Sequence, residues 1–480
     1  MTSIHVIPPE VLSTIFRLAL GQPPLRPDTI ELLAHHRTRI RALVQLSLVC
    51  QKWRSVAVGD GTLWTMLPVH TSRPDCQELT RAVLKRSKHA MLDVSVVCVD
   101  DLDSSREAIF SKISQNFHRI RSFHLVSTSS TTLRHLSSPA SKLEELNIFI
   151  AEQPAELESL FGGNLPALRS LTLAGFPSWP LGLFSNLKDL RLVLPPSHPT
   201  VMVSTLIDVM SRSPGIEQMD ISAFLSMIDD SSPSCLVHVP NLRKLTLRDC
   251  DSATILSHTV IPTMANVKIV MDHRRMKNRM HIASRDCHIL CSIPEDMSTL
   301  KFLGGSTVLV LQQDRKIGFG VGFFRSRSSQ ASLRILDRSA SVKSFARQSV
   351  EALANRSHRF GSIEELCITL FPGTVASWST ILYRFKRIQR LSMVALHAPS
   401  ILSALMVAGE HGLPVCPSIR QLTIYEKDDD HAVALDNDDV VRFLAVRKRL
   451  DCAATEVNIY WPRGRKRWRR GDEGTLVVDS

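Results

Sequence analysis

The chain has 480 residues, of which 44% are hydrophobic and 22% are charged, a balance typical of globular proteins that excludes a disordered, collagen-like or low-complexity chain. No apolar stretch approaches the roughly 18 residues that a membrane-spanning helix needs, so we expect no membrane segment. The net charge is +12, but six basic residues lie between Arg463 and Arg470, so the basicity is partly local and supports nucleic-acid binding only weakly.

The first ten residues, MTSIHVIPPE, lack the basic and apolar segments of a secretory signal. The ten cysteines lie far apart along the chain, which is typical of buried thiols in a reducing compartment. We therefore expect a soluble intracellular protein, located in the cytoplasm, the nucleus or both.

The first predicted helix begins at Pro8 and Pro9, because proline is tolerated in a first turn, where its missing N–H would have no partner. Gly21 can end this helix, and the prolines that follow prevent its continuation. Apolar residues at helical spacing give the helix one apolar face: Val11, Leu12, Ile15, Phe16 and Ala19.

Two more helices are predicted before residue 60. Asp28, with Glu31 three residues later, is a capping-box arrangement, and apolar residues then continue as far as Val49. A third, shorter apolar face surrounds Trp53. Helices over only about sixty residues bury too little apolar surface to be stable alone. We expect their apolar faces to contact a partner protein or the rest of the chain, as a helical cap would.

Two segments of this region together resemble an F-box. They are residues 7–16, IPPEVLSTIF, and residues 46–57, LSLVCQKWRSVA. The pair Leu63-Trp64 resembles the late Leu-Trp of many fungal members of this family. The resemblance covers residues 4–67, and it departs from a compact F-box in the longer stretch between residues 20 and 42.

The resemblance implies an adaptor interface. F-box helices bind a Skp-family adaptor, which connects them to a cullin–RING ubiquitin ligase. This would also explain the undersized helical unit, because the partner would complete its core. The residues that the resemblance implies as adaptor contacts or F-box core are Ile7, Pro8, Leu12, Ile15, Phe16, Leu46, Val49, Cys50 and Trp53.

An apolar triplet recurs along the rest of the chain, with apolar residues at a first position and then three and five positions later. The second and third residues share one face of a short strand and are predicted to point inward, while the first anchors the turn that enters the strand. The copies are Ile120-Phe123-Leu125, Leu143-Leu146-Ile148, Leu168-Leu171-Leu173, Leu187-Leu190-Leu192, Ile216-Met219-Ile221, Leu242-Leu245-Leu247, Ile363-Leu366-Ile368, Ile388-Leu391-Met393, Ile419-Leu422-Ile424 and the poorer Ala454-Val457-Ile459.

The spacing of the triplets is typical of leucine-rich repeats. Within each run, most copies start 19 to 31 residues apart, close to the roughly 20–29 residues of such a repeat. Segments such as residues 202–210 have helical periodicity. Strand and helix in repetition predict an irregular horseshoe with a parallel sheet on its concave face. An ordinary doubly wound α/β domain is the alternative, because its strands also alternate with helices.

The predicted fold class is therefore α/β, with a small N-terminal helical F-box followed by an irregular leucine-rich-repeat horseshoe. In such repeats Leu245 should be buried on a strand, whereas Arg243 and Lys244 should be exposed. The predicted domains are an F-box-like helical domain at 1–67, a helical linker and first repeat at 68–118, irregular repeats at 119–462 with a poor match at 272–360, and a basic tail at 463–480.

No segment carries a convincing catalytic or ligand-binding motif. Residues 317–322 place Gly at every second position but lack the dinucleotide fingerprint, so a hairpin or strand pair is favoured. The histidines and cysteines between 281 and 291 have no second pair at zinc-ligand spacing, and the aspartates at 428–430 lack the spacing of a calcium loop. We therefore predict no enzymatic activity, no cofactor and no metal site.

The basic segment from Arg463 to Arg470 permits three interpretations: a solvated tail, a nuclear-import signal, or direct phosphate binding helped by Trp461 and Trp468. Burying six unpaired charges would be very costly, so we expect this segment to be exposed.

Taken together, the resemblance and the repeats predict a non-catalytic substrate receptor of a cullin–RING (SCF-type) ubiquitin ligase. The F-box would bind the Skp-family adaptor, and the repeats would bind an unknown protein target and raise its concentration near the ubiquitin carrier. Two alternatives stay open. One is an interaction scaffold outside the ubiquitin system, and the other is a nucleic-acid-associated protein that uses its basic tail.

Overall fold

The computed structural model divides into two compact units, Met1–Asp230 and Ser231–Ser480, here called the N-terminal and C-terminal units. Among the described residues, no helix is both long enough and apolar enough to cross a membrane. The structure describes residues 7–21, 29–99, 104–152, 160–163, 165–176, 185–194, 201–222, 225–226, 236–271, 292–294, 300, 303, 306–314, 318–326, 331–337, 348–349, 351–353, 355, 363–369, 374–407, 414–425, 437–450, 452, 455–461, 464–470 and 476–479.

The N-terminal unit begins with the helices α1 (Pro9–Ala19), α2 (Thr29–Val49) and α3 (Gln51–Gly59), followed by the 3-10 turn Gly61–Trp64. The first helix begins in the predicted Pro-Pro pair, and Gly21 beyond its end has a φ of 71°, as expected for a residue that stops a helix. Helices α1 and α3 pack together, with the rings of Phe16 and Trp53 meeting edge to face at 5.0 Å. The stretch 29–49 forms one uninterrupted helix.

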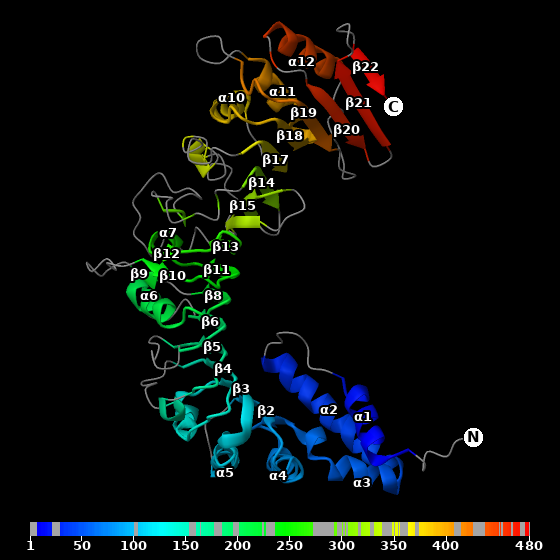
Figure 1. Ribbon diagram of the computed structural model, residues 1–480, viewed down its shortest axis with the longest axis vertical. Coiled ribbons are helices and arrows are strands. Elements are labelled where there is room, and N and C mark those ends of the chain that lie inside the picture. The colour runs from blue at the N-terminus through cyan, green and yellow to red at the C-terminus, as the bar shows by residue number, and fades with distance from the viewer. Residues whose placement is uncertain are drawn as a thin grey trace. The chain divides into compact units, whose positions relative to one another are not determined.

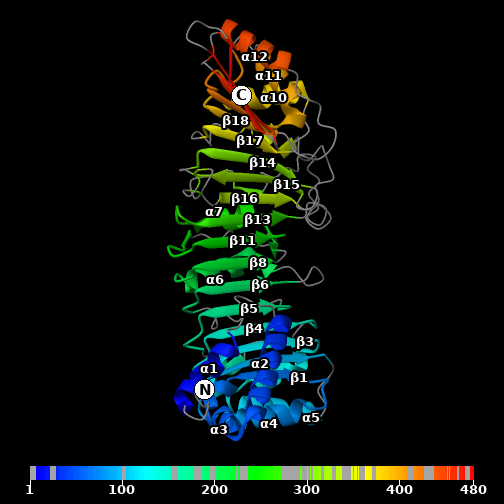
Figure 2. The same cartoon turned by 90° about the vertical axis from the view of Figure 1, so that its right-hand side faces the viewer.

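A parallel sheet follows, in which the strands of the N-terminal unit pair in chain order (Figure 2). Its strands are β1 (Met66–His70), β2 (Leu92–Cys98), β3 (Ile120–Ser127), β4 (Glu145–Ile150), β5 (Ser170–Ala174), β6 (Asp189–Val193) and β8 (Gln218–Ser222). The connections include α4 (Cys76–Arg86), α5 (Ser104–Ser114), α6 (Val203–Arg212), the 3-10 turns Phe117–Arg119, Ser130–Leu136 and Leu160–Gly163, and a small parallel pair of β7 (Val201–Met202) with β9 (Leu225–Ser226).

The predicted triplets lie in register on these strands. Leu146 pairs with Leu171, and Leu171 pairs with Leu190 on the next strand along. All triplet residues of this unit are buried, which confirms the predicted inward face of the strands. The first triplet residue closes the turn before its strand, as where Leu143 N–H donates to the carbonyl of Ala140 at 3.1 Å. Alternate residues of each strand are buried, so a shift of the pairing by one residue would move them to the other face. The buried triplet residues therefore set the register of these strands.

The C-terminal unit contains a mixed sheet. Strands β11 (Lys244–Arg248), β13 (Asn266–Met271) and β16 (Ala331–Asp337) pair parallel, and β15 (Gly318–Phe324) and β14 (Val308–Asp314) then pair antiparallel with their neighbours. On its other side, β14 pairs parallel with β17 (Glu365–Thr369). The parallel pairing then runs from β17 to β18 (Arg390–Val394), β19 (Gln421–Tyr425) and β20 (Glu456–Trp461), each with the next. The other elements are α7 (Ser252–Ser257), α10 (Val375–Arg384), α11 (Ala398–Met406), α12 (Asn437–Arg449), the 3-10 turn Ala395–His397, and the parallel pair of β10 (Val237–His238) with β12 (Thr259–Val260).

The glycine-rich motif forms the expected strand pair. Its glycines lie on β15, between the antiparallel neighbours β14 and β16. A Cβ atom at Gly320 would lie 2.8 Å from Cδ2 of Leu336, so a larger residue at this position would require the Leu336 side chain to shift. The region 272–360, which matches the repeat pattern poorly, thus contributes three strands to the sheet among its described residues, and the middle one, β15, runs antiparallel to the other two.

The basic segment near the C-terminus differs from the solvated tail that the sequence suggested. Its backbone forms β21 (Gly464–Arg470), which pairs antiparallel with β20 and with β22 (Leu476–Asp479). Without this pairing, β20 would expose unpaired backbone N–H and C=O groups at its edge, and β21 satisfies them. The side chains of residues 464–470 are not among those that the structure describes, so the exposure of the basic residues stays a prediction. The His/Cys motif at 281–291 and the aspartates at 428–430 also lie outside the described residues.

Candidate adaptor-binding surface

Helix α1 carries apolar side chains on two faces. Leu12 and Phe16 are buried against the rest of the N-terminal unit. Val11, Ile15 and Leu18 are exposed by 48%, 42% and 77%. Their spacing of four and then three residues places these three side chains in one stripe along the helix. We call this set the α1 stripe.

A second group of exposed apolar side chains lies at the C-terminal end of α2. Val44, Leu48 and Val49 are exposed, with Leu48 at 66% and Val49 at 58%. Exposed large apolar side chains that cluster in stripes mark interaction surfaces more often than isolated ones do. The α1 stripe and these α2 residues are thus the two candidate contact regions for a protein partner.

The structure divides the residues that the F-box resemblance singled out into a core group and a surface group. Leu12 and Phe16 lie in the core, so they support the helices and are not available to a partner. Of the others, Pro8, Ile15 and Val49 are exposed, whereas Ile7, Leu46, Cys50 and Trp53 are half-buried. The F-box resemblance does not imply adaptor contact for Val11, Leu18 and Leu48, although positions 11, 15 and 18 have the spacing of one helix face.

Hydrogen bonds within the F-box-like region hold these helices in place. The thiol of Cys50 caps α3 by accepting from the N–H of Trp53 at 3.5 Å. Trp64 Nε1 donates to the carbonyl of Ala57 at 2.6 Å, which ties the buried end of the region to α3. Asp60 accepts from Ser13 of α1 and from Thr62. Partial burial opposes ionisation of Asp60, but these hydrogen bonds outweigh it and lower the pKa of its carboxyl below the ordinary value.

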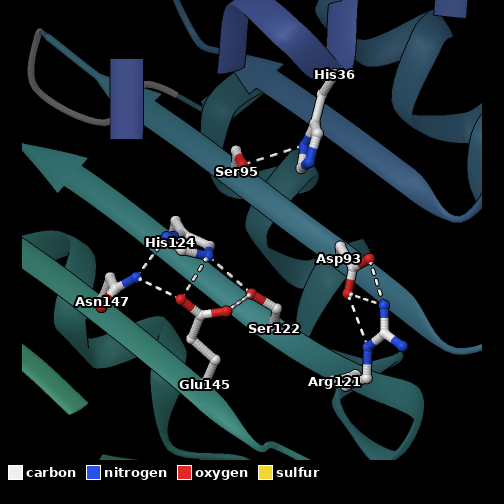
Figure 3. Close-up of polar contacts among 8 residues, drawn as sticks. All are labelled: His36, Asp93, Ser95, Arg121, Ser122, His124, Glu145 and Asn147. Carbon is white, nitrogen blue, oxygen red and sulfur yellow. Dashed lines mark hydrogen bonds and ion pairs between the residues drawn. The ribbon is translucent and has the colours of Figure 1, made fainter. Parts of the chain in front are cut away.

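Helix α2 also contacts the sheet, through a different face from its exposed end. It packs on β1, β2 and β3, and Figure 1 shows it on the side of the chain where β2 lies. Within this contact the hydroxyl of Ser95 on β2 lies 3.1 Å from Nδ1 of His36, as Figure 3 shows. Burial lowers the pKa of His36 to about 3, and repulsion from His124, His35 and Arg39 adds to this effect. The imidazole is therefore neutral at physiological pH.

A polar cluster on β3 and β4 lies next to this contact (Figure 3). The hydroxyl of Ser122 lies 2.7 Å from Nε2 of His124 and donates to Glu145 at 3.1 Å. The amide of Asn147 lies 2.7 Å from Nδ1 of His124 and 3.1 Å from Glu145. Burial opposes ionisation of Glu145, but the contacts with His124, Ser122 and Asn147 outweigh it and lower the pKa of the carboxyl.

This Ser-His-Glu cluster does not have the geometry of a nucleophilic triad. In a triad the carboxylate binds the ring nitrogen opposite to the one that faces the hydroxyl. Here Glu145 lies 3.7 Å from Nε2 of His124, the same nitrogen that faces Ser122, and an amide faces Nδ1. Both Ser122 and His124 are also buried. The arrangement therefore supports a structural role for the cluster, which links β3 to β4.

A second polar pair joins β2 to the first residues of β3. Arg121 Nη2 donates to the carboxylate of Asp93 at 2.7 Å (Figure 3). Burial raises the pKa of Asp93, and the pairing with Arg121 compensates for only part of that cost.

The sheet face opposite the triplet residues, here called the open face, changes character along the N-terminal unit. On β2 and β3 most of its side chains are buried, as at Ser95 and His124. From β4 onward they are at least partly exposed at several positions, including Phe149 at 36% and Arg191. In the C-terminal unit the open face carries the stacked rings of Tyr425 and Tyr460, with centroids 5.5 Å apart. Both units thus offer polar and aromatic side chains on this face.

Comparison with known families agrees with the helical arrangement of the first residues. Residues 4–67 match the F-box-like family, and this range includes α1, α2, α3 and the turn at Leu63-Trp64. A comparison of the sequence with curated proteins finds no match. F-box domains typically bind Skp-family adaptors, and the exposed stripe on α1 lies inside the matched range. The N-terminal segment of this chain, residues 4–67, is an F-box-like domain.

Proposed function

We propose that the chain is the substrate-recognition subunit of a cullin–RING (SCF-type) ubiquitin ligase. The observation that carries this proposal is the F-box-like domain at residues 4–67, with the exposed α1 stripe inside it. The stripe and the exposed end of α2 would bind a Skp-family adaptor. The sheet would bind a protein target and hold it near the ubiquitin carrier, so the chain itself would act by proximity and not as an enzyme.

The repeated strands support a leucine-rich-repeat architecture for the target-binding part. Within each unit, triplets at repeat spacing lie in register on parallel strands, such as Leu366, Leu391 and Leu422. The arrangement departs from a regular repeat at the antiparallel strands β14 and β15. The pair Leu63-Trp64, which is buried in the core, is the feature that resembles the fungal members of the F-box family. The target would bind the open face, in the cytoplasm or the nucleus.

The first prediction tests adaptor binding at the α1 stripe. The double variant Ile15→Ser, Leu18→Ser should weaken binding of a purified Skp-family adaptor by about 30-fold or more, because each apolar side chain buried at an interface contributes on the order of 1.5–3 kcal/mol. Both side chains are exposed in the free chain, so the thermal unfolding midpoint should change little. Isothermal titration calorimetry or biolayer interferometry measures the affinity.

The matched control is Arg17→Ser, which removes an exposed side chain of the same helix outside the stripe. It should leave the affinity within about three-fold of wild type. Unchanged adaptor binding in the double variant would show that the adaptor does not bind the α1 stripe. If the chain binds the adaptor but never co-purifies with a cullin and a RING subunit, the scaffold alternative is favoured.

A further inference from the structure

Helix α2 has a first region with a buried face and a last region with exposed apolar side chains. From Leu32 to Leu43 its buried side chains, including His36 and Ile40, lie along one face. In its last turns, Leu48 and Val49 are exposed. The helix has no break between these regions, and at about 1.5 Å per residue its 21 residues span about 31 Å. One rigid element therefore carries a buried region and an exposed apolar end.

The open face shows where the buried region of α2 ends. Ser95, His124, Asn147, Thr172 and Arg191 occupy equivalent positions on β2 to β6, each in register with the next. The first two are buried, the next two are half-buried and the last is exposed. Helix α2 contacts β1, β2 and β3, and Figure 2 shows it crossing these strands. The change in exposure thus follows the edge of the helix.

The contact combines apolar burial with specific polar partners. Leu33 and Ile40 of α2 are buried, as is Val97 on the open face of β2. Among them the neutral imidazole of His36 meets the fully buried hydroxyl of Ser95. A buried hydrogen bond of this kind penalises displaced arrangements, because each partner would lose its bond without gaining water. The contact therefore specifies one position of the helix on the sheet.

The unusual length of the F-box-like domain agrees with this arrangement. The stretch between residues 20 and 42 is longer than in a compact F-box, and its described part forms the first turns of α2. The same stretch supplies the side chains that cover β1 to β3. Arg39 also donates to the carbonyl of Gly21 at 2.6 Å, which connects this part of α2 with the end of α1.

We propose that α2 is a rigid connection between the adaptor-binding surface and the sheet of the N-terminal unit. Its first part occupies the open face of β1 to β3 permanently, so these strands take no part in target binding. Its exposed end then holds an adaptor at a fixed position relative to the sheet. The adaptor half of this statement rests on the proposed function, whereas the permanent contact between α2 and the sheet does not.

Hydrogen–deuterium exchange of the full-length chain tests the connection without any partner protein. Ser95→Arg places a long charged side chain in the closed contact beneath α2. It should raise the exchange rates of α2 amides by about ten-fold or more, while the amides of β5 and β6 keep their rates. Thr172→Arg makes the same change in the same row of the open face, beyond the covered strands, and should leave α2 unchanged. Equal α2 exchange in wild type and Ser95→Arg would overturn the proposal.

A milder pair of variants covers the case in which Ser95→Arg also accelerates exchange in β5 and β6 by unfolding the unit. Ser95→Val nearly keeps the side-chain volume but removes the hydroxyl that faces His36. It should raise exchange in α2 by about five-fold or more, and Thr172→Val should not. Unchanged α2 exchange in Ser95→Val would then reject the connection.

Adaptor affinity separates the failure of this proposal from the failure of the proposed function. Ser95→Arg should keep adaptor affinity within about three-fold of wild type, because Ile15, Leu18 and Leu48 lie outside the altered contact. If α2 exchange responds as expected but no variant or wild-type chain binds an adaptor, the connection stands and the ligase function fails. If the adaptor binds normally while α2 exchange is insensitive to both Ser95 variants, the connection fails and the ligase function stands.

Discussion

His36 is a histidine placed where a charged imidazole is strongly disfavoured. It is buried between α2 and β2, with His35 and Arg39 on its own helix and His124 on β3 nearby. The hydroxyl of Ser95 compensates for burial of the neutral ring only. The protonation state of His36 therefore affects the stability of the contact between α2 and β2.

The pH dependence of unfolding tests the state of His36. Its pKa is about 3 in the folded chain, against 6.5 for an unperturbed histidine, so below pH 6.5 the unfolded chain binds a proton that the folded chain does not. This group therefore contributes no pH dependence well above pH 6.5, and it destabilises the fold increasingly as the pH falls from 6.5 towards 3. Relative to His36→Gln, wild type should lose about 1.5 kcal/mol more unfolding free energy between pH 6.5 and pH 5.

Urea unfolding followed by tryptophan fluorescence at the two pH values measures this difference. His118→Gln, at an exposed histidine of the same unit, is the control and should follow the wild-type pH dependence. A His36→Gln variant with the same pH dependence as wild type would show that His36 is already accessible to protons in the folded chain.

At the scale of secondary-structure elements, the triplet strands are the unit that the chain repeats. Each contributes two buried side chains and an open face, and in several copies the first triplet residue closes the turn before the strand, as at Leu143 and Leu242. In the C-terminal unit Leu245 pairs with Val267 and is fully buried, while the neighbouring Arg243 and Lys244 are exposed, as predicted. The strand thus has one face that tolerates charge and one that does not.

Two aspartate substitutions on β11 test this difference. Leu245→Asp should destabilise the C-terminal unit by more than about 3 kcal/mol, because it removes a buried apolar side chain and buries a carboxylate without a partner. Lys244→Asp, one residue earlier on the opposite face, should change the unfolding free energy by less than about 1 kcal/mol. Circular dichroism during thermal and urea unfolding provides both values. Comparable losses in the two variants would contradict the assignment of faces.

Two segments of the C-terminal unit show how far sequence patterns predict individual elements. The glycine-rich segment formed the predicted strand pair because alternating glycines permit close strand packing. The charge of the basic segment predicts exposed side chains, but it says little about the conformation of the backbone. Residues 464–470 form a strand beside β20 because β20 offers unpaired backbone groups to which they can bond.

At the scale of the whole molecule, the F-box-like domain is not an independent appendage of the N-terminal unit. Helix α2 covers the open face of β1 to β3, so the domain and the first strands share buried surface. A truncation that removes the adaptor-binding helices therefore alters the sheet as well. Point variants in the α1 stripe are the cleaner way to separate adaptor binding from target binding.

Deleting residues 1–49 tests this dependence. The truncated chain exposes Ser95, Val97 and His124 to water, so exchange in β1 to β3 should rise by about ten-fold or more, and exchange in β5 and β6 should rise less. Hydrogen–deuterium exchange at the peptide level measures both groups of strands. Equal protection of β1 to β3 in the truncated and intact chains would mean that α2 contributes nothing to their stability.

The sequence by itself determined the first helices, the triplet strands and the buried face of those strands, because periods of 3.6 and 2 report the buried side of a single element. It also indicated the F-box-like domain at residues 4–67, through motifs that lie close together in the chain. It did not separate the core residues Leu12 and Phe16 from the surface residues Ile15 and Leu18, because α1 is apolar on two faces.

Only the tertiary structure decided what α2 contacts. The hydrogen bond between His36 and Ser95 joins residues 59 positions apart, and no local period of the sequence encodes that distance. The same holds for the position of the predicted strand pair between β16 and β17, for the pairing of β20 with β21, and for the polar cluster around His124. Each of these depends on which backbone edges and faces remain unoccupied once the neighbouring elements have packed, and that is a property of the folded chain as a whole.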